Sequence, residues 1–243
     1  ADCDGAPDDD ADGDGFDAAT AGGDDCDDTD HMVHPYGFEL PDGSDNDCDG
    51  LTDESAGTSL SLSDDDYDGV SFGFSFPFCG STHSTVYIGS NGILFFTSPS
   101  GDYTETETEF LGTHGQSIAA FWDDLDPRSA GTVYYQDYGD AFGVFYEELP
   151  EYATSNSNTF STVFFDDGTI LQSWDGMASV DGMVGWSCGT GVAGAVDLSA
   201  EVDALEPHEL YVGSGSEDSL YELFYSGSPL DLDGEMVWYT GAL

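Results

Sequence analysis

The sequence predicts an all-β fold: an antiparallel β-sandwich preceded by a small, loop-rich, Asp-rich module. From about residue 58 onward, apolar and polar residues alternate in short runs separated by Gly, Ser, Asn and Asp, a pattern typical of half-buried strands. Among the 51 acidic residues aspartate far outnumbers glutamate, and aspartate favours turns over helices. We therefore expect an Asp-rich module over residues 1–57 and a sandwich over residues 58–243.

Short apolar runs mark the individual strands of the predicted sandwich. Its body contains VSFGFSFPF, TVYIGSNGILFF, SIAAFWDDL, GTVYYQDY, AFGVFYEEL, NTFSTVFFDDGTILQSW and GMVGWS. The Asp167-Gly168 pair inside the sixth run predicts a hairpin turn. Residues 207–243 add HELYVG, SLYELFYSG and EMVWYTG, which either complete the sandwich or form exposed edge strands as a C-terminal extension. The best helical candidate, around Asp197 to Leu205, is short.

Acidic loops of the form Asp-x-Asp-x-Asp-Gly occur three times near the start of the chain. They are Asp10, Asp12, Asp14 with Gly15; Asp45, Asp47, Asp49 with Gly50; and Asp64, Asp66, Asp68 with Gly69. Calcium takes about six to eight oxygen ligands, and carboxylates on alternate residues of a tight loop supply them. The module has few large apolar residues to offset its ordering entropy, so we expect several calcium ions and a disulfide to hold it.

The loops predict a specific set of ligands. In the first loop Phe16 would add a carbonyl oxygen, and Asp24 or Asp25 would close the shell. In the second loop Leu51 would add its carbonyl, and Asp53 or Glu54 would close the shell. The acids between the two loops are expected to ligate an ion shared with one of them; they are Asp27, Asp28 and Asp30.

Two further acidic groups have alternative interpretations. The triplet Asp64, Asp66 and Asp68 borders the first sandwich strand, so it either binds calcium or forms a solvated turn. The acids Asp123, Asp124 and Asp126 follow a predicted strand, and turn capping is favoured over ion binding there.

Copper is the lesser alternative to calcium. His31, Met32 and His34 offer two imidazoles and a thioether, ligands that suit copper better than calcium. Packing or hydrogen bonding of His34 beside Pro35 is the simpler interpretation of that residue.

The charge balance restricts the partners of this chain. It has 51 acidic residues, one basic residue (Arg128) and a formal net charge of -50. Nucleic acid and anionic membranes are therefore excluded as partners, and no apolar run of about 18 residues is present to insert into a membrane. Like charges this dense oppose compaction unless salt screens them, which suggests a saline, calcium-containing environment.

Five cysteines without a Cys-x-x-Cys motif favour an oxidising, extracellular setting. Cys79 and Cys188 are natural partners because both lie in the hydrophobic part. A Cys26–Cys48 bridge would close the metal-binding segment and leave Cys3 free or joined to another chain. The sequence leaves this connectivity open.

Two family resemblances cover most of the chain. Residues 25–30, 33–35, 42–50 and 53–54 resemble the Asp-rich metal-binding repeat of secreted bacterial proteins, the MopE type. The repeat departs from that family at Pro41, where the family usually has a cysteine. Residues 73–78, 86–92, 118–126, 131–135, 158–160 and 184–185 are similar to nidogen-like extracellular domains. That second resemblance implies adhesion or matrix association without catalysis.

The sequence therefore predicts a non-enzymatic, secreted calcium-binding protein that associates with copies of itself as a cell-surface, filament, sheath or matrix subunit. It contains no His-Glu-x-x-His, Gly-x-Ser-x-Gly or phosphate-binding Gly-Lys motif. Paired acids such as Glu147 and Glu148 are best interpreted as a solvated face in so acidic a chain. One alternative is a monomeric adhesin that binds a glycan or a matrix protein. Another is an accessory region of a secreted hydrolase.

Overall fold

The computed structural model describes residues 10–37, 44–52, 57–198, 211–212 and 218–240. The described part is nearly all β, with two antiparallel sheets packed face to face. Its one helix is a π-helical turn, η1 (Glu109–Thr113). No helix in these ranges is long and apolar enough to cross a membrane.

The first sheet has seven strands in the order β1-β6-β7-β8-β9-β13-β11. Their bounds are β1 Thr58–Leu60, β6 Thr132–Asp137, β7 Ala141–Leu149, β8 Asn158–Phe165, β9 Ile170–Asp175, β13 Glu235–Thr240 and β11 Tyr211–Val212. The predicted hairpin joins β8 to β9, where Gly168 adopts a φ of 96° that favours glycine. All neighbours are antiparallel except β11, which runs parallel to β13.

The second sheet has six strands in the order β12-β10-β5-β4-β3-β2. Their bounds are β12 Ser219–Phe224, β10 Gly182–Ser187, β5 Ser117–Trp122, β4 Ile93–Phe95, β3 Ser81–Gly89 and β2 Tyr67–Phe78. The tail strands β12 and β13 thus complete the sandwich, as one of the two sequence interpretations proposed. The helical candidate at 197–205 lies almost entirely outside the described residues.

An aromatic core fills the space between the sheets. Alternate residues of β2 point inward, so Phe72 and Phe76 pack edge-on against Phe164 of β8, with ring centroids 5.4 and 5.1 Å apart. Buried polar groups also join the sheets, since the Trp174 indole donates a hydrogen bond to the Ala120 carbonyl at 2.8 Å. The Cys79–Cys188 disulfide then links the end of β2 to the segment after β10, as expected from the sequence.

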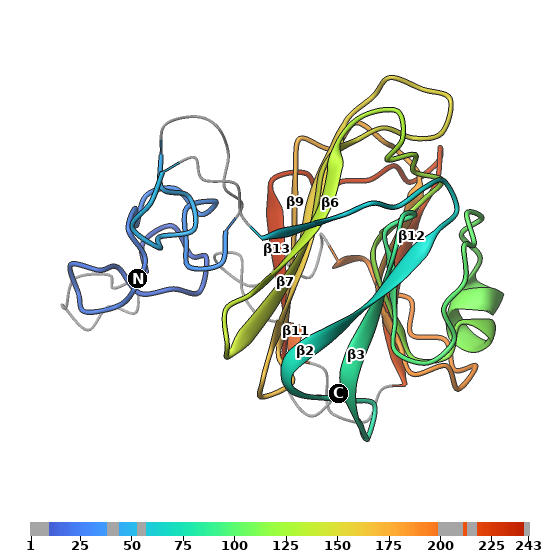
Figure 1. Cartoon of the computed structure of the whole chain (residues 1–243), viewed down its shortest axis with the longest axis horizontal. Helices are drawn as coiled ribbons and strands as arrows, with labels where there is room; N and C mark the ends of the chain where they lie inside the picture. The colour runs from blue at the N-terminus through green and yellow to red at the C-terminus, as the bar shows by residue number, and fades with distance from the viewer. Residues whose placement is uncertain (1–9, 38–43, 53–56, 199–210, 213–217, 241–243) are drawn as a thin grey trace.

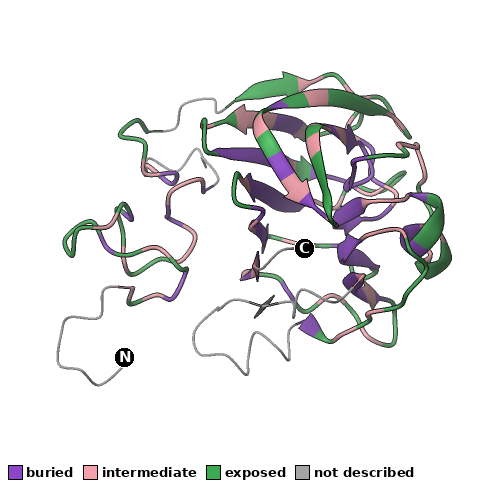
Figure 2. Cartoon of the chain, turned by 90° about the horizontal axis from the view of Figure 1, so that it is seen from below, coloured by how far each residue is buried: buried purple, intermediate pink, exposed green. Residues whose placement is uncertain are grey.

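Both outer faces of the sandwich are partly covered, which gives the molecule four layers (Figure 1). The segment around η1 covers the six-stranded sheet, where Phe110 and Leu111 pack against Phe95, Trp122 and Tyr221. The Asp-rich module covers the outer face of the seven-stranded sheet. Most module residues are exposed or half-buried, whereas several strands of the sandwich are largely buried and drawn in purple (Figure 2).

The free edge of β12 is capped by the preceding chain segment. The Val196 amide donates to the Tyr221 carbonyl at 3.0 Å, and the Tyr221 amide donates to Gly194 at 3.2 Å. Glu222 lies on the inward face of β12, between Leu220 and Phe224, and accepts a hydrogen bond from the Leu198 amide at 2.6 Å. Burial, together with nearby carboxylates, raises the pKa of Glu222 to about 7.

We expect Glu222 to make folding stability fall as the pH rises. The pKa of Glu222 in the folded protein, about 7, lies above the ordinary value of 4.5. The folded state therefore binds more protons than the unfolded state between these values, so the contribution of Glu222 to the free energy of unfolding is complete below about pH 4.5 and is lost as the pH rises through 7. The loss over the whole range is on the order of 3 kcal/mol, because one pKa unit corresponds to about 1.4 kcal/mol. Urea unfolding at pH 5 and pH 8 in constant high salt measures it.

Glu222→Gln should flatten this part of the pH dependence, because the amide cannot ionise and its oxygen still accepts the Leu198 hydrogen bond. Glu148→Gln, at an exposed glutamate, is the matched control. Equal pH dependence in wild type and Glu222→Gln would contradict this assignment.

Candidate metal centre

The first Asp loop folds around its own carboxylates. Asp10 accepts hydrogen bonds from the amides of Gly13 at 2.8 Å and Gly15 at 3.2 Å. Asp12 accepts from the Asp14 amide at 3.3 Å, and Asp14 accepts from the Phe16 amide at 2.7 Å. The two glycines have φ values of 80° and 91°, which close the turn. Asp12 and Asp14 each use Oδ1 in these bonds, which leaves Oδ2 for another partner.

The following segment brings two more acids to this loop. The Ala19 amide donates to the Asp25 carbonyl at 2.7 Å, and the Asp25 amide donates to Asp17 at 3.1 Å, so the chain folds back at Asp25. Asp28 accepts the Ala11 amide at 2.7 Å. Carboxylate oxygens consequently approach within 4.8 Å of one another in two groups that share Asp12; these are Asp12, Asp14, Asp25 and Asp10, Asp12, Asp28.

The inner carboxylates of this first-loop site are buried without a compensating charge. Asp14 and Asp25 are 0% and 1% exposed. The Oδ2 atoms of Asp12, Asp14 and Asp25 are buried and accept no hydrogen bond. Burial, reinforced by the neighbouring carboxylates, raises the pKa of all three groups, that of Asp14 to about 8. These oxygens therefore lack the partner that a buried charge requires.

No Lys or Arg side chain of this protein is available to neutralise the first-loop site. Arg128 is the only such residue in the sequence. Its guanidinium is held elsewhere, 2.7 Å from Asp64 and 2.8 Å from Asp126. A cation from solution is the compensation that fits an oxygen-only group of this kind.

The second Asp loop repeats the same hydrogen-bond pattern. Asp45 accepts from the amides of Asp49 at 3.1 Å and Gly50 at 2.9 Å. Asp47 accepts from the Asp49 amide at 3.2 Å, and Asp49 accepts from the Leu51 amide at 2.8 Å. The structure thus brings Asp45, Asp47 and Asp49 within 4.8 Å of one another, as predicted. Asp53 and Glu54, the predicted closing ligands, lie outside the described residues.

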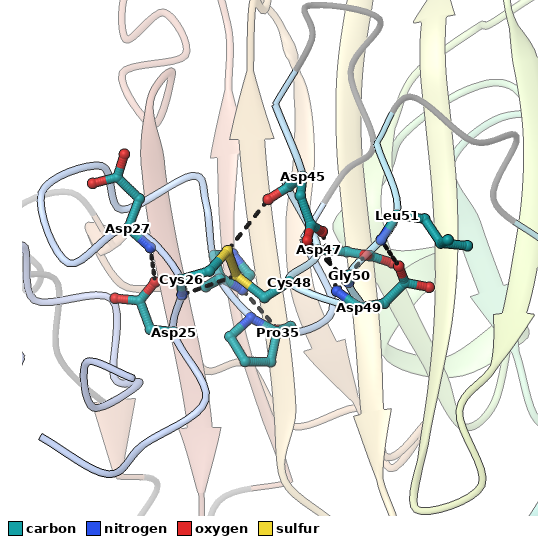
Figure 3. The surroundings of a disulfide bond; sticks show 11 residues. Asp25, Cys26, Asp27, Pro35, Asp45, Asp47, Cys48, Asp49, Gly50 and Leu51 are labelled. Carbon is teal, nitrogen blue, oxygen red and sulfur yellow. Dashed lines mark hydrogen bonds between the residues drawn. A yellow bond between two sulfur atoms is a disulfide. The ribbon is translucent and has the colours of Figure 1, made fainter. Parts of the chain in front are cut away.

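A disulfide connects the two loops. Cys26 follows Asp25 of the first-loop site, and Cys48 lies between Asp47 and Asp49 of the second loop (Figure 3). This pairing is the one the sequence favoured for the module. Because the bond spans 22 residues, it removes chain entropy from the unfolded module and fixes the two acidic loops near each other.

Other predicted ligands take different positions. Asp27 accepts from its neighbour Thr29 and Asp30 accepts from the Met32 amide, so neither joins a carboxylate group. Of the two acids expected to close the first loop, Asp25 joins the group with Asp12 and Asp14, whereas Asp24 is exposed. Phe16 and Leu51 contribute their amides to the loops in the bonds described above.

The third acidic triplet adopts the turn, one of the two interpretations that the sequence left open. β2 begins at Tyr67, so Asp68 lies in an extended strand, and Asp66 caps the turn by accepting from Ser63 and Tyr67. Asp64 instead groups with Asp65 and Asp124 within 4.8 Å. Sequence reasoning missed Asp65 because its positive φ of 53°, which turns the chain, leaves no mark in the residue pattern.

The Asp64, Asp65 and Asp124 group lines a pocket of about 270 Å³, together with Tyr103 and Tyr152. Asp126 beside it binds Arg128 and Ser129, which agrees with the turn-capping interpretation. Hydrogen bonds from these two residues lower the pKa of Asp126 to about 2.

The histidines do not form a copper site within the described ranges. The His34 ring stacks on Phe16 with centroids 5.1 Å apart, and its Nδ1 donates to the Pro35 carbonyl at 2.9 Å. Burial lowers the pKa of His34 to about 4, so the ring is neutral. The His31 Nε2 donates instead to Gly234 of the sandwich at 2.8 Å, and Met32 packs near Tyr134 and Phe145.

Comparison with known families agrees with both resemblances. Residues 25–54 match a model labelled Cu-binding MopE and described as "Putative metal-binding motif". Residues 49–164 match the model described as NIDO related. The chain thus carries a MopE-type metal-binding motif followed by a NIDO-related domain. No solved structure matches the chain.

We expect Asp14→Asn to separate metal binding from intrinsic stability. The substitution removes a buried carboxyl group that the metal-free fold must keep protonated, with its pKa raised to about 8, so the metal-free variant should be more stable than the metal-free wild type near neutral pH. At a free calcium concentration of about a hundred times the Kd, the free energy of unfolding of the wild type should rise by about 2.7 kcal/mol. The variant should bind calcium at least about tenfold more weakly at this site. Chemical unfolding with calcium and with chelator measures both effects.

Asp24→Asn is the matched control, because it makes the same change at an exposed neighbour of Asp25. It should leave calcium-dependent stability unchanged. If Asp14→Asn and wild type gained equal stability from calcium, the first-loop site would not bind the ion.

Proposed function

We propose that this protein is a secreted, non-enzymatic, calcium-binding structural protein, a subunit that associates with copies of itself in a cell-surface or matrix assembly. The observation that carries the proposal is the first-loop site, whose buried carboxylates have no Lys or Arg partner. A metal-binding motif joined to a NIDO-related domain supports an extracellular binding or structural role. Two disulfides fit the same setting.

The chemistry of the ligands favours calcium over copper. The groups built by the first and second loops offer carboxylate oxygens, which are hard ligands that calcium prefers. Copper favours imidazole and sulfur ligands. His34 and His31 use ring nitrogens for hydrogen bonds to backbone carbonyls, and the sulfurs of Cys26 and Cys48 form a disulfide.

An edge strand with few charges of its own supports association between copies. Residues 69–101 contain no Asp, Glu, Lys or Arg, although the whole chain has 51 acidic residues. They include most of β2, which forms one edge of the six-stranded sheet and exposes Ser71, Gly73 and Ser75. Edge strands offer backbone groups to a neighbour. A second anionic copy would meet few charges from β2 itself, although the Asp137 carboxylate lies beside Gly73.

Glycan adhesion by a monomer is the second candidate function. The observation in its favour is the pocket lined by Asp64, Asp65 and Asp124, beside which Tyr103 and Tyr152 are 52% and 51% exposed. Exposed tyrosines beside carboxylates suit sugar rings and their hydroxyl groups. A monomer that bound glycans and did not self-associate would favour this function.

We predict that added charge on β2 blocks self-association. Ser71→Asp with Ser75→Asp places two carboxylates on the exposed face of the edge strand, so copies should repel each other there. Sedimentation in calcium and high salt should show assemblies of the wild type and monomers of the variant. The calcium affinity of the variant should stay within about twofold of the wild-type value, because neither serine is a member of the Asp groups described above.

Ser155→Asp is the control, since it adds charge at an exposed loop position away from β2. It should assemble like the wild type. Chelation should disassemble the wild type, because the ions that offset its negative charge are removed. A wild type that is monomeric with and without calcium would contradict self-association and favour the adhesin.

A further inference from the structure

The first Asp loop lies directly on β13 of the sandwich. The Trp238 indole Nε1 donates a hydrogen bond to the Asp14 carbonyl at 3.0 Å. Gly15 packs so closely that a Cβ atom there would lie 3.1 Å from the same nitrogen. The Phe16 ring lies 5.4 Å from the Trp238 ring. Three consecutive residues of the loop therefore contact one side chain of the sandwich.

An aromatic layer extends this contact across the seven-stranded sheet. On its far side Trp238 stacks on Phe165, with centroids 5.5 Å apart. The Phe165 ring centroid lies 5.4 Å from that of Tyr36 in the module, and the Tyr36 centroid lies 4.9 Å from that of Tyr138. These rings cover the outer-face residues Ala141, Val163, Leu171 and Met236. The module is thus attached to the sheet by ring packing, and the tryptophan lies beside the metal loop.

Asp14 takes part in both the metal loop and the contact with β13. Its carboxylate belongs to the Asp12, Asp14 and Asp25 group, and its Oδ2 is buried without a hydrogen bond. Its carbonyl oxygen is held by Trp238. Without a cation the clustered carboxylates repel one another and favour an open loop. An open loop would move the Asp14 carbonyl and Phe16 away from the indole.

We propose that Trp238 is a positioning residue of the first-loop metal site, and that metal binding there and docking of the module on the seven-stranded sheet are one coupled step. This inference rests on the proposed cation binding. The coupling is reciprocal: an ion that orders the loop favours docking, and a docked loop binds the ion more tightly. The first loop and Trp238 both lie outside the two segments that match family models.

Calcium titration of the full chain at constant high salt tests the coupling, with calorimetry as the affinity measurement. Trp238→Phe keeps an aromatic ring but loses the hydrogen bond to Asp14. We expect it to weaken calcium binding at the first loop about tenfold, the lower end for loss of a group that orients metal ligands. The second loop should be unaffected. Trp186→Phe, the same change at a buried core position, should leave calcium affinity within about twofold.

Tryptophan fluorescence gives a second, independent measurement. The chain has four tryptophans, of which Trp122, Trp174 and Trp186 are at most 1% exposed. Trp238 is only half-buried, so its solvation should change most when the module undocks. Chelation should shift the wild-type emission to longer wavelength, and this shift should be absent in Trp238→Phe.

The outcomes separate the two claims. Calcium binding of equal affinity in wild type and Trp238→Phe, with no fluorescence shift on chelation, would overturn the coupling while leaving calcium binding intact. A wild type that binds no calcium would overturn both. If Trp238→Phe fails to fold, hydrogen exchange of the wild type decides. Chelation must increase the exchange of residues 14–16 and of residues 33–37, the module segment whose Tyr36 packs on the sheet, together. Faster exchange of residues 14–16 alone overturns the coupling.

Discussion

The constraint on which this structure depends is the burial of carboxylates in a chain that has one Arg and no Lys. Each buried acid must be protonated, bound to Arg128 or compensated by an ion from solution. The charge of Asp126 is compensated by Arg128. Glu222 avoids a buried charge by staying protonated below about pH 7, because its pKa is raised to about that value. The first-loop site has neither Arg nor Lys, and five acids converge there, so without a cation the buried Asp14 must stay protonated, with its pKa raised to about 8. Its folded form is therefore the part of the chain for which a divalent cation matters most.

This constraint explains how so small a module is held. Its few large apolar residues cannot form a core of their own, so Phe16 and Tyr36 pack against the outer face of the seven-stranded sheet instead. The Cys26–Cys48 bond joins the two acidic loops, and Trp238 joins the first of them to β13. The disulfide and the aromatic layer thus act on the same short segment as the proposed ion, and each reduces the entropy that the others must offset.

Local patterns in the sequence predicted much of the fold. Period-two alternation predicted the strands, Asp167-Gly168 predicted the hairpin, and the loop spacing predicted the group of Asp45, Asp47 and Asp49. For the third triplet the sequence left a calcium loop and a solvated turn open. The structure fits the turn, because Asp66 caps it and Asp68 lies in the extended strand β2. The position of Trp238 could not be predicted, since it depends on which sheet face receives the module.

The number and identity of bound ions test the central claim most directly. Elemental analysis and native mass spectrometry of the full chain, equilibrated with equimolar calcium and copper in high salt, would measure both. We expect at least two calcium ions per chain, one for each Asp loop described above, and no copper held in their place. A chain that retained no metal, or that bound copper in preference to calcium, would contradict it.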